Sequence, residues 1–180
     1  CRQLQEWHQQ GNTSWSMAVN LSTLQFEQPG LVEHVMDCLH RYQIAPGDLI
    51  LEVTETTAMS NPEESVRILT ELTRAGVKAS IDDFGTGYSS LLYLKRMPAC
   101  ELKIDRAFVK ELNGDGDDAT IVSAIVALAK TLDLKIVAEG VETEAQQAFL
   151  TKLGCNTLQG FLLGKPVSAH EAAQLGRAAE

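Results

Sequence analysis

Short runs of alternating apolar and polar residues are interspersed with longer stretches that have a helical apolar period. Six short runs predict β-strands: Ser16–Leu21, Leu49–Thr54, Lys78–Asp82, Glu101–Ile104, Leu134–Ala138 and Asn156–Gln159. Helices are predicted at Arg2–Gln9, Gly30–Tyr42, Asn61–Gly76, Leu91–Arg96, Asp117–Leu132, Thr143–Leu153 and Ala169–Ala179. This repeated strand–helix order predicts parallel strands that are covered by helices.

The alternation within the strands gives each one an apolar face and a polar end. In the second run Leu49, Leu51 and Val53 share one face, and Glu52 points the other way. Equivalent polar residues at the C-terminal strand ends are Asn20, Asp82, Lys103, Glu139 and Gln159. Polar groups that converge at one mouth favour a barrel. An open doubly wound sheet, which usually carries fewer of them on one axis, is the alternative.

The fold class expected is α/β, a TIM-like (β/α)8 barrel that is incomplete at the N-terminus. The chain opens in the helix Arg2–Gln9 and offers six strands, fewer than the eight of this fold. We therefore expect residues 1–180 to be a single domain that lacks its first strand region. No linker divides it, and 113–118 reads as a surface loop with a helix start.

Composition narrows the classes of partner. Hydrophobic residues make up 44% of the chain, which excludes disorder, and 15 Lys and Arg against 24 Asp and Glu give a net charge of −9. An acidic chain without a basic stripe argues against a nucleic-acid duplex, and an anionic ligand would need a cation. The sequence shows no membrane-length apolar run and no signal peptide. We expect a cytoplasmic segment without membrane contact.

The four cysteines are Cys1, Cys38, Cys100 and Cys155. They lie too far apart for the close spacing of a zinc site. We expect reduced and mostly buried thiols.

The polar strand ends consist largely of oxygen ligands. Asn20, Glu52, Asp82, Asp83 and Glu139 offer the donors that Mg²⁺ and Mn²⁺ prefer. Adjacent aspartates suit two ions, because one carboxylate can bridge while its neighbour holds the second ion. Each carboxylate alone could equally be a helix cap or a solvated charge. Their shared position and parity favour a metal site.

Other residues near the strand ends suggest supporting roles. Lys103 is an inward cation that could stabilise a transition state, or form a structural salt bridge with Asp105 or a neighbouring carboxylate. Asp105 could orient Lys103 or support the site from just outside it. Gly85 and Gly87 suit a loop with positive φ angles. Glu55, on the opposite parity from Glu52, is a candidate anchor for that loop.

These residues form a set of motifs that resembles the EAL family of cyclic di-GMP phosphodiesterases. The motifs occur in order at Val19–Ser22, Leu51–Glu55, Ile81–Leu91, Leu102–Arg106, Val137–Glu142 and Gln159–Gly160. The resemblance covers essentially the whole chain. It implies a bacterial enzyme on a barrel that hydrolyses cyclic di-GMP to linear pGpG with two Mg²⁺ or Mn²⁺ ions.

The resemblance also implies a ligand set. Asn20, Glu52 and Asp82 would hold one metal, and Asp82 would bridge to a second metal held by Asp83 and Glu139. Asp82, Glu139 and Lys103 would be the catalytic residues, with Lys103 beside the hydrolytic water. Further roles that the resemblance implies are Gln159 in the site, Glu55 as support of the 83–90 loop with Gly85, Thr86 and Gly87, and Glu142 as a structural or supporting carboxylate.

Two departures from the family pattern stand out. The Glu-Ala-Leu signature is absent from the chain, and its glutamate would lie on the missing strand. We therefore expect this chain to be an impaired enzyme. Asn156 stands where an aspartate is expected after Gly154–Cys155.

Two other functions remain open. One is a receptor that binds cyclic di-GMP without cleaving it, although such members usually lose metal ligands and the visible ones are kept here. The other is an enolase-type barrel enzyme with Mg²⁺ and a lysine base, which the adjacent aspartates disfavour.

The resemblance is compatible with a homodimer, and with an upstream sensor or diguanylate cyclase domain in a parent protein that is anchored to a membrane.

Overall fold

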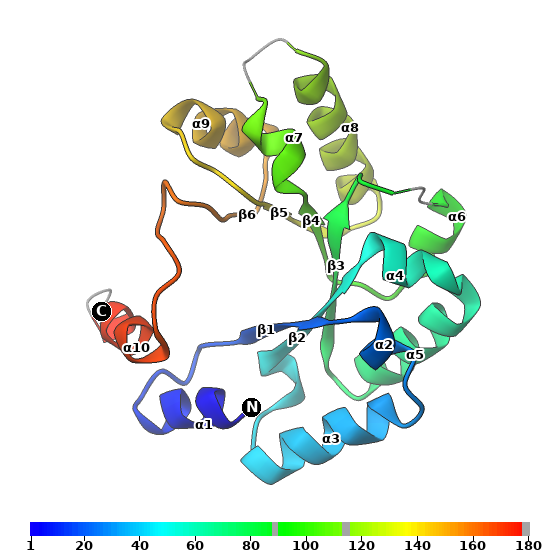
Figure 1. The fold of residues 1–180 in the computed structure, drawn as a ribbon, viewed down its shortest axis with the longest axis vertical. Helices are drawn as coiled ribbons and strands as arrows, with labels where there is room; N and C mark the ends of the chain where they lie inside the picture. Colours follow the sequence, from blue (N-terminus) through cyan, green and yellow to red (C-terminus); the bar gives the residue numbers. More distant parts are fainter. Residues whose placement is uncertain (88–89, 113–115, 178–180) are drawn as a thin grey trace.

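The protein, seen in a computed structural model that describes residues 1–87, 90–112 and 116–177, is built on one parallel sheet. Its six strands follow chain order, β1-β2-β3-β4-β5-β6, and every neighbouring pair is parallel. The sheet curves like part of a barrel wall, with α3, α5, α8 and α9 on its outer side (Figure 1). This arrangement is an incomplete TIM-like barrel, as the sequence predicted.

The element bounds follow the predicted pattern closely. The strands are β1 Met17–Leu21, β2 Leu49–Thr54, β3 Lys78–Phe84, β4 Glu101–Ile104, β5 Lys135–Ala138 and β6 Thr157–Leu158. The helices are α1 Arg2–Gln9, α2 Thr23–Phe26, α3 Leu31–Tyr42, α4 Glu55–Ser60, α5 Pro62–Arg74, α6 Leu91–Leu94, α7 Arg106–Lys110, α8 Asp117–Thr131, α9 Glu144–Leu153 and α10 Ala169–Arg177, with a 3-10 turn η1 at Pro46–Asp48.

Three short helices, α2, α4 and α7, were not predicted. Each begins at a side chain that accepts a hydrogen bond from a main-chain N–H of the first turn: Ser22, Thr54 and Asp105 respectively. Helices this short show too little apolar period to be detected, but their capping residues are visible in the sequence. α4 and α7 matter for the site because they start directly after β2 and β4.

The outer face of the sheet forms the hydrophobic core against the helices. Leu51, Val53, Ile81, Leu102 and Ile104 are at most 3% exposed. The inner face has buried residues too, and several of them are polar: Glu52, Ser80, Asp82 and Lys103. Burying charged groups is costly unless they are paired, so this polar inner face needs an explanation beyond packing.

The ends of the described chain meet beside the sheet. Trp7 Nε1 donates a hydrogen bond to the carbonyl of Ala169, so α1 lies against the start of α10. Among the residues that the structure describes, β1 pairs only with β2, and Val19 on β1 is 38% exposed. In the described ranges, no helix is both long and apolar enough to cross a membrane.

Three expectations needed correction or fall outside the described residues. The four cysteines are free but half-buried, not mostly buried. Of the two loop glycines, Gly85 has φ +100° and Gly87 has no positive φ; the second left-handed residue near the loop is Asp83. Residues 113–115 of the expected surface loop, 88–89 of the glycine-rich loop and 178–180 of the tail lie outside the described residues.

Candidate active site

Lys103 lies at the centre of the polar strand ends. Its ammonium Nζ is 2.8 Å from Glu139 Oε1, 2.9 Å from Glu52 Oε1 and 3.1 Å from Asp82 Oδ1. The lysine comes from β4, and the three carboxylates come from the ends of β2, β3 and β5. Four neighbouring strands therefore deliver their polar groups to one point at the C-terminal edge of the sheet.

This cluster is shielded from solvent. The side chains of Lys103, Glu52 and Asp82 are 7%, 9% and 9% exposed, and that of Glu139 is 19% exposed. Burial by itself would lower the pKa of Lys103. Hydrogen bonds to Glu139 and Glu52, with the charge of Asp82, outweigh burial and raise that pKa above its ordinary value. The lysine is therefore held as a cation.

A β-bulge brings Asp82 and Asp83 to the same side of β3. Ile81 pairs with Leu102 and Phe84 pairs with Ile104, so Asp82 and Asp83 together face one residue of β4, Lys103. Asp83 has φ +52°, a left-handed conformation that aspartate tolerates better than most residues. Strand alternation alone would send Asp83 to the outer face. The bulge re-aims it, as bulges beside active sites commonly do.

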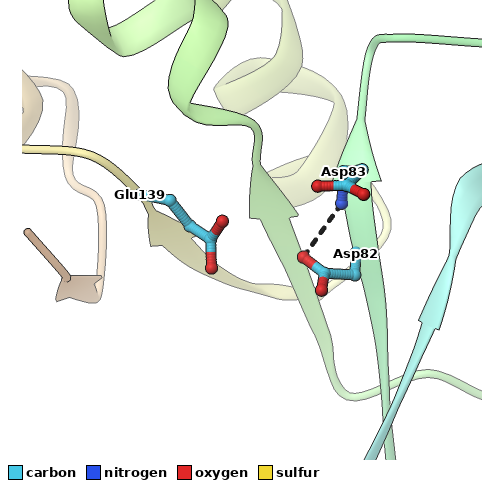
Figure 2. A group of neighbouring side chains, drawn as sticks. All are labelled: Asp82, Asp83 and Glu139. Carbon is cyan, nitrogen blue, oxygen red and sulfur yellow. Dashed lines mark hydrogen bonds between the residues drawn. The ribbon is translucent and has the colours of Figure 1, made fainter. Parts of the chain in front are cut away.

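The two aspartates and Glu139 form a compact group of carboxylates. One oxygen from each residue lies within 4.8 Å of the other two. Figure 2 shows Glu139 reaching from the end of β5 toward Asp82, whose Oδ1 accepts a hydrogen bond from the Asp83 N–H at 2.9 Å. Burial raises the pKa of Asp83, and the charge of Asp82 and a hydrogen bond with Asp105 raise it further.

The donor set fits divalent metal ions. The group offers only oxygen atoms, the donors that hard cations such as Mg²⁺ and Mn²⁺ prefer. Within this cluster Lys103 is the one cation that contacts Glu52, Asp82 and Glu139, and Asp83 and Asp105 add two more carboxyls. Five carboxyls and one ammonium leave a formal charge of four negative units, which two divalent cations would balance.

Glu55 is tied to the loop that follows β3. It is the first residue of α4, it is 1% exposed, and its Oε2 accepts hydrogen bonds from Gly85 N at 2.7 Å and Gly87 N at 3.4 Å. Thr86 Oγ1 donates to the Asp83 carbonyl at 2.9 Å. The glutamate thus restrains the backbone just past Asp83. It does not belong to the compact carboxylate group.

Asn20 lies at the margin of this centre. It is an exposed residue of β1 and stands opposite Glu52 in the strand register. Asp105 lies at the other margin, where its Oδ1 accepts the Ala107 N–H at 2.8 Å and so caps α7. Its carboxyl faces Asp83, not Lys103.

A cavity of about 260 Å³ opens beside Glu139. Glu142 and Gln159, both predicted site residues, line it together with Arg106 and Phe161, which the sequence reasoning missed. The Phe161 ring is 60% exposed, unusual for a large aromatic side chain. The signal for both was their position, since Arg106 directly follows Asp105 and Phe161 follows Gln159–Gly160. Two larger cavities lie elsewhere, between α3 and α5 and beside β1.

Close backbone contacts shape the wall of this cavity. A Cβ on Gly160 would lie 2.1 Å from the Val141 carbonyl oxygen, and one on Gly140 would lie 2.6 Å from Arg106 Cβ. Only glycine fits at either position.

Asn156, where an aspartate was expected, accepts a hydrogen bond from Ile136 N through Oδ1 at 2.8 Å, a bond that an aspartate would also accept.

Comparison with known proteins places the chain in a family. The EAL domain model matches residues 1–166. MucR of Pseudomonas aeruginosa, described as a bifunctional diguanylate cyclase/cyclic di-GMP phosphodiesterase, is 64% identical over 95% of this chain and 25% of its own length. The chain thus spans about a quarter of that relative.

Solved structures agree with this assignment. The MucR phosphodiesterase in complex with c-di-GMP is 63% identical, with a TM-score of 0.92 over 96% of this chain and 70% of that one. The manganese and c-di-GMP complex of Klebsiella pneumoniae BlrP1 is 32% identical, with a TM-score of 0.78 over 88% of this chain and 41% of that one. The chain therefore belongs to the EAL domain family.

Proposed function

We propose that this chain is a cyclic di-GMP phosphodiesterase domain that hydrolyses the cyclic dinucleotide to linear pGpG with two Mg²⁺ or Mn²⁺ ions. The observation that carries the proposal is the convergence of Glu52, Asp82 and Glu139 on Lys103, with Asp83 turned toward the same group by the bulge. Packing alone does not require four charged groups on the inner face of a sheet.

The excess negative charge of the cluster explains why cations are needed. A phosphodiester is an anion, and it would be repelled by a site that carries five carboxyls and one ammonium. Asp82, Asp83 and Glu139 are the residues that would hold one ion, and Asn20 and Glu52 would hold a second together with Asp82. Such ions, when bound, lower the pKa of water and offset phosphate charge.

The residues of the chain then have distinct tasks. The Lys103 ammonium provides a fixed positive charge at the strand ends, where it can donate a hydrogen bond to an oxygen that gains negative charge. Glu55 holds the backbone past Asp83 through Gly85 N. The buried side chains and the packed outer face keep the donors in place, and position alone is worth large factors in rate.

The cavity beside Glu139 suits one half of the dinucleotide. Phe161 offers an exposed ring on which a base can stack, and Arg106 and Gln159 offer hydrogen-bond donors for base edges or phosphate. Glu142 offers an acceptor for the N–H groups of guanine. MucR, the relative with 64% identity, is described by name as acting on cyclic di-GMP, which supports the same substrate here.

The enolase-type alternative is disfavoured by the state of Lys103. A lysine that acts as a base must lose its proton near neutral pH, so its pKa has to be lowered. In the metal-free cluster, three carboxylate contacts raise the pKa of Lys103 instead, and the adjacent Asp82–Asp83 pair also argues against this alternative. The lysine is suited to an electrostatic role.

The direct test is turnover of cyclic di-GMP by the 180-residue chain. The nucleotides are separated chromatographically after incubation with Mn²⁺ or Mg²⁺, with EDTA as the metal-free arm and the Asp82→Asn variant as the site control. In keeping with an impaired enzyme, we expect slow conversion to pGpG that EDTA abolishes and that Asp82→Asn reduces by at least about 10²-fold, the scale for misplaced reacting groups. Turnover that is unaffected by both would refute the proposed site.

The same experiment separates enzyme from receptor. If the chain binds cyclic di-GMP by calorimetry but releases no linear product with either metal, a non-catalytic binding role replaces hydrolysis. If it neither binds nor converts the nucleotide, the proposed substrate is wrong.

A further inference from the structure

Lys103 contacts carboxylates that the proposed metal ions would also need. Its three partners, Glu52, Asp82 and Glu139, come from three different strands and lie 2.8–3.1 Å from one ammonium nitrogen. Two of them, Asp82 and Glu139, also belong to the compact carboxylate group with Asp83. An ammonium group and a divalent cation cannot both bind the same carboxylate oxygens at full strength.

We propose that Lys103 is a built-in counter-ion that competes with the metal ions for these carboxylates, and so sets the metal affinity of the site while it holds the strand ends together before metal binds. The inference rests on the proposed metal centre. It assigns Lys103 a positioning task that is separate from its charge beside the substrate.

The contacts explain why such a counter-ion is needed. Glu52 and Asp82 are 9% exposed, so neither can rely on water to offset its charge. Removing one partner from a buried ion cluster leaves the others uncompensated, which is strongly destabilising. In the described part of the chain, no other lysine or arginine makes a salt bridge to these three carboxylates.

Competition makes a reciprocal prediction. If metal ions can replace the ammonium in balancing the carboxylates, losing Lys103 should lower the stability of the metal-free protein and raise its affinity for metal. Because binding linkage is reciprocal, the two effects should offset each other at saturating metal. A lysine with only a structural role would lower stability at every metal concentration and would not tighten metal binding.

The experiment compares wild type, Lys103→Met and the control Lys135→Met. Lys135 is an exposed lysine at the start of β5, the end away from Glu139. Melting temperature is measured in EDTA and in a Mn²⁺ titration to saturation, and Mn²⁺ affinity is measured by calorimetry. For Lys103→Met we expect a melting temperature at least about 5 °C lower in EDTA. We also expect a Mn²⁺ Kd at least about tenfold lower than wild type, and a melting-temperature difference that closes at saturation. Lys135→Met should change neither quantity.

The outcomes separate this proposal from the proposed function. A Lys103→Met protein that binds Mn²⁺ no more tightly, or that stays less stable by the same margin at saturation, overturns the competition. If the variant does not fold in EDTA, Lys103→Gln is measured in the same way. If a variant folds only with Mn²⁺, a melting temperature equal to that of wild type at saturation supports the proposal, and a lower one overturns it. Wild-type protein that Mn²⁺ does not stabilise at all would instead refute the metal centre itself.

Discussion

The hydrogen bonds that Glu55 accepts from the loop after β3 predict that removing the charge of Glu55 lowers both stability and turnover. Glu55→Gln keeps the size of the side chain but removes its negative charge. The carboxylate now accepts the Gly85 N–H at 2.7 Å and the Gly87 N–H at 3.4 Å while it is 1% exposed. The amide of glutamine accepts more weakly, and its NH₂ end cannot accept at all.

The magnitude follows from the class of hydrogen bond. A bond to a charged group contributes about 1.5–3 kcal/mol and a neutral one about 0.5–1.5 kcal/mol. The 2.7 Å bond carries most of the effect, and the longer Gly87 bond adds little. We therefore expect Glu55→Gln to lower the free energy of unfolding by about 1–2 kcal/mol. Because Gly85 lies close to Asp83 in sequence, loosening it should also cost about 10²-fold in turnover.

Two assays measure these effects, and a matched variant controls them. Urea denaturation reports the free energy of unfolding, and conversion of cyclic di-GMP with saturating Mn²⁺ reports turnover. Glu33→Gln removes the same charge from an exposed position on α3 and should leave both nearly unchanged. Wild-type turnover in Glu55→Gln would refute the reasoning that this glutamate fixes the Asp83 backbone. A stability loss equal to that of Glu33→Gln would refute the energetic estimate.

Three other substitutions test the charge of Asp83, the substrate cavity and the packing of its wall. Asp83→Asn should raise the melting temperature in EDTA at pH 7, because burial and Asp82 raise the pKa of Asp83 and its charged form therefore destabilises the fold. This gain in melting temperature should disappear as the pH falls below the usual carboxyl range, where Asp83 is protonated in both the folded and the unfolded state. A gain that persists there would contradict the electrostatic cause. Phe161→Ala should raise KM for cyclic di-GMP by about tenfold with little change in kcat, since base stacking on an aromatic ring contributes about 1–3 kcal/mol; an unchanged KM would remove Phe161 from the substrate cavity. Gly160→Ala should lower the free energy of unfolding by about 3 kcal/mol in urea, because its Cβ would lie 2.1 Å from the Val141 carbonyl oxygen, and near-normal stability would show that this wall can relax.

Much of the fold was predictable because the strands have an unambiguous period. Apolar residues such as Leu51 and Val53 alternate with Glu52, and that alternation located both the strand and the face that carries the site. The short helices were missed for the opposite reason. α4 and α7 begin within one residue of a strand end, and their capping residues Thr54 and Asp105 were the only local signal.

The sequence predicted which residues belong to the site, but it could not predict how they are arranged. Parity predicted that Glu52, Asp82, Lys103 and Glu139 would share the inner face, yet it could not predict that Lys103 would contact three carboxylates at once. Parity would also have sent Asp83 to the outer face. The β-bulge that re-aims it depends on the register between β3 and β4, which is a property of the folded sheet. Phe161 and Arg106 were missed because loop residues have no period to reveal where they point.

The proposed function depends on the strand-end carboxylates being the metal centre of a cyclic di-GMP phosphodiesterase. The most direct measurement is anomalous scattering from crystals of the chain grown with Mn²⁺ and cyclic di-GMP. We expect a manganese peak bound by Asp82, Asp83 and Glu139, with a second peak sharing Asp82, and nucleotide density that reaches the cavity of Phe161. Manganese bound only by histidine or cysteine side chains, with the carboxylate cluster free of metal while the nucleotide is bound, would contradict it.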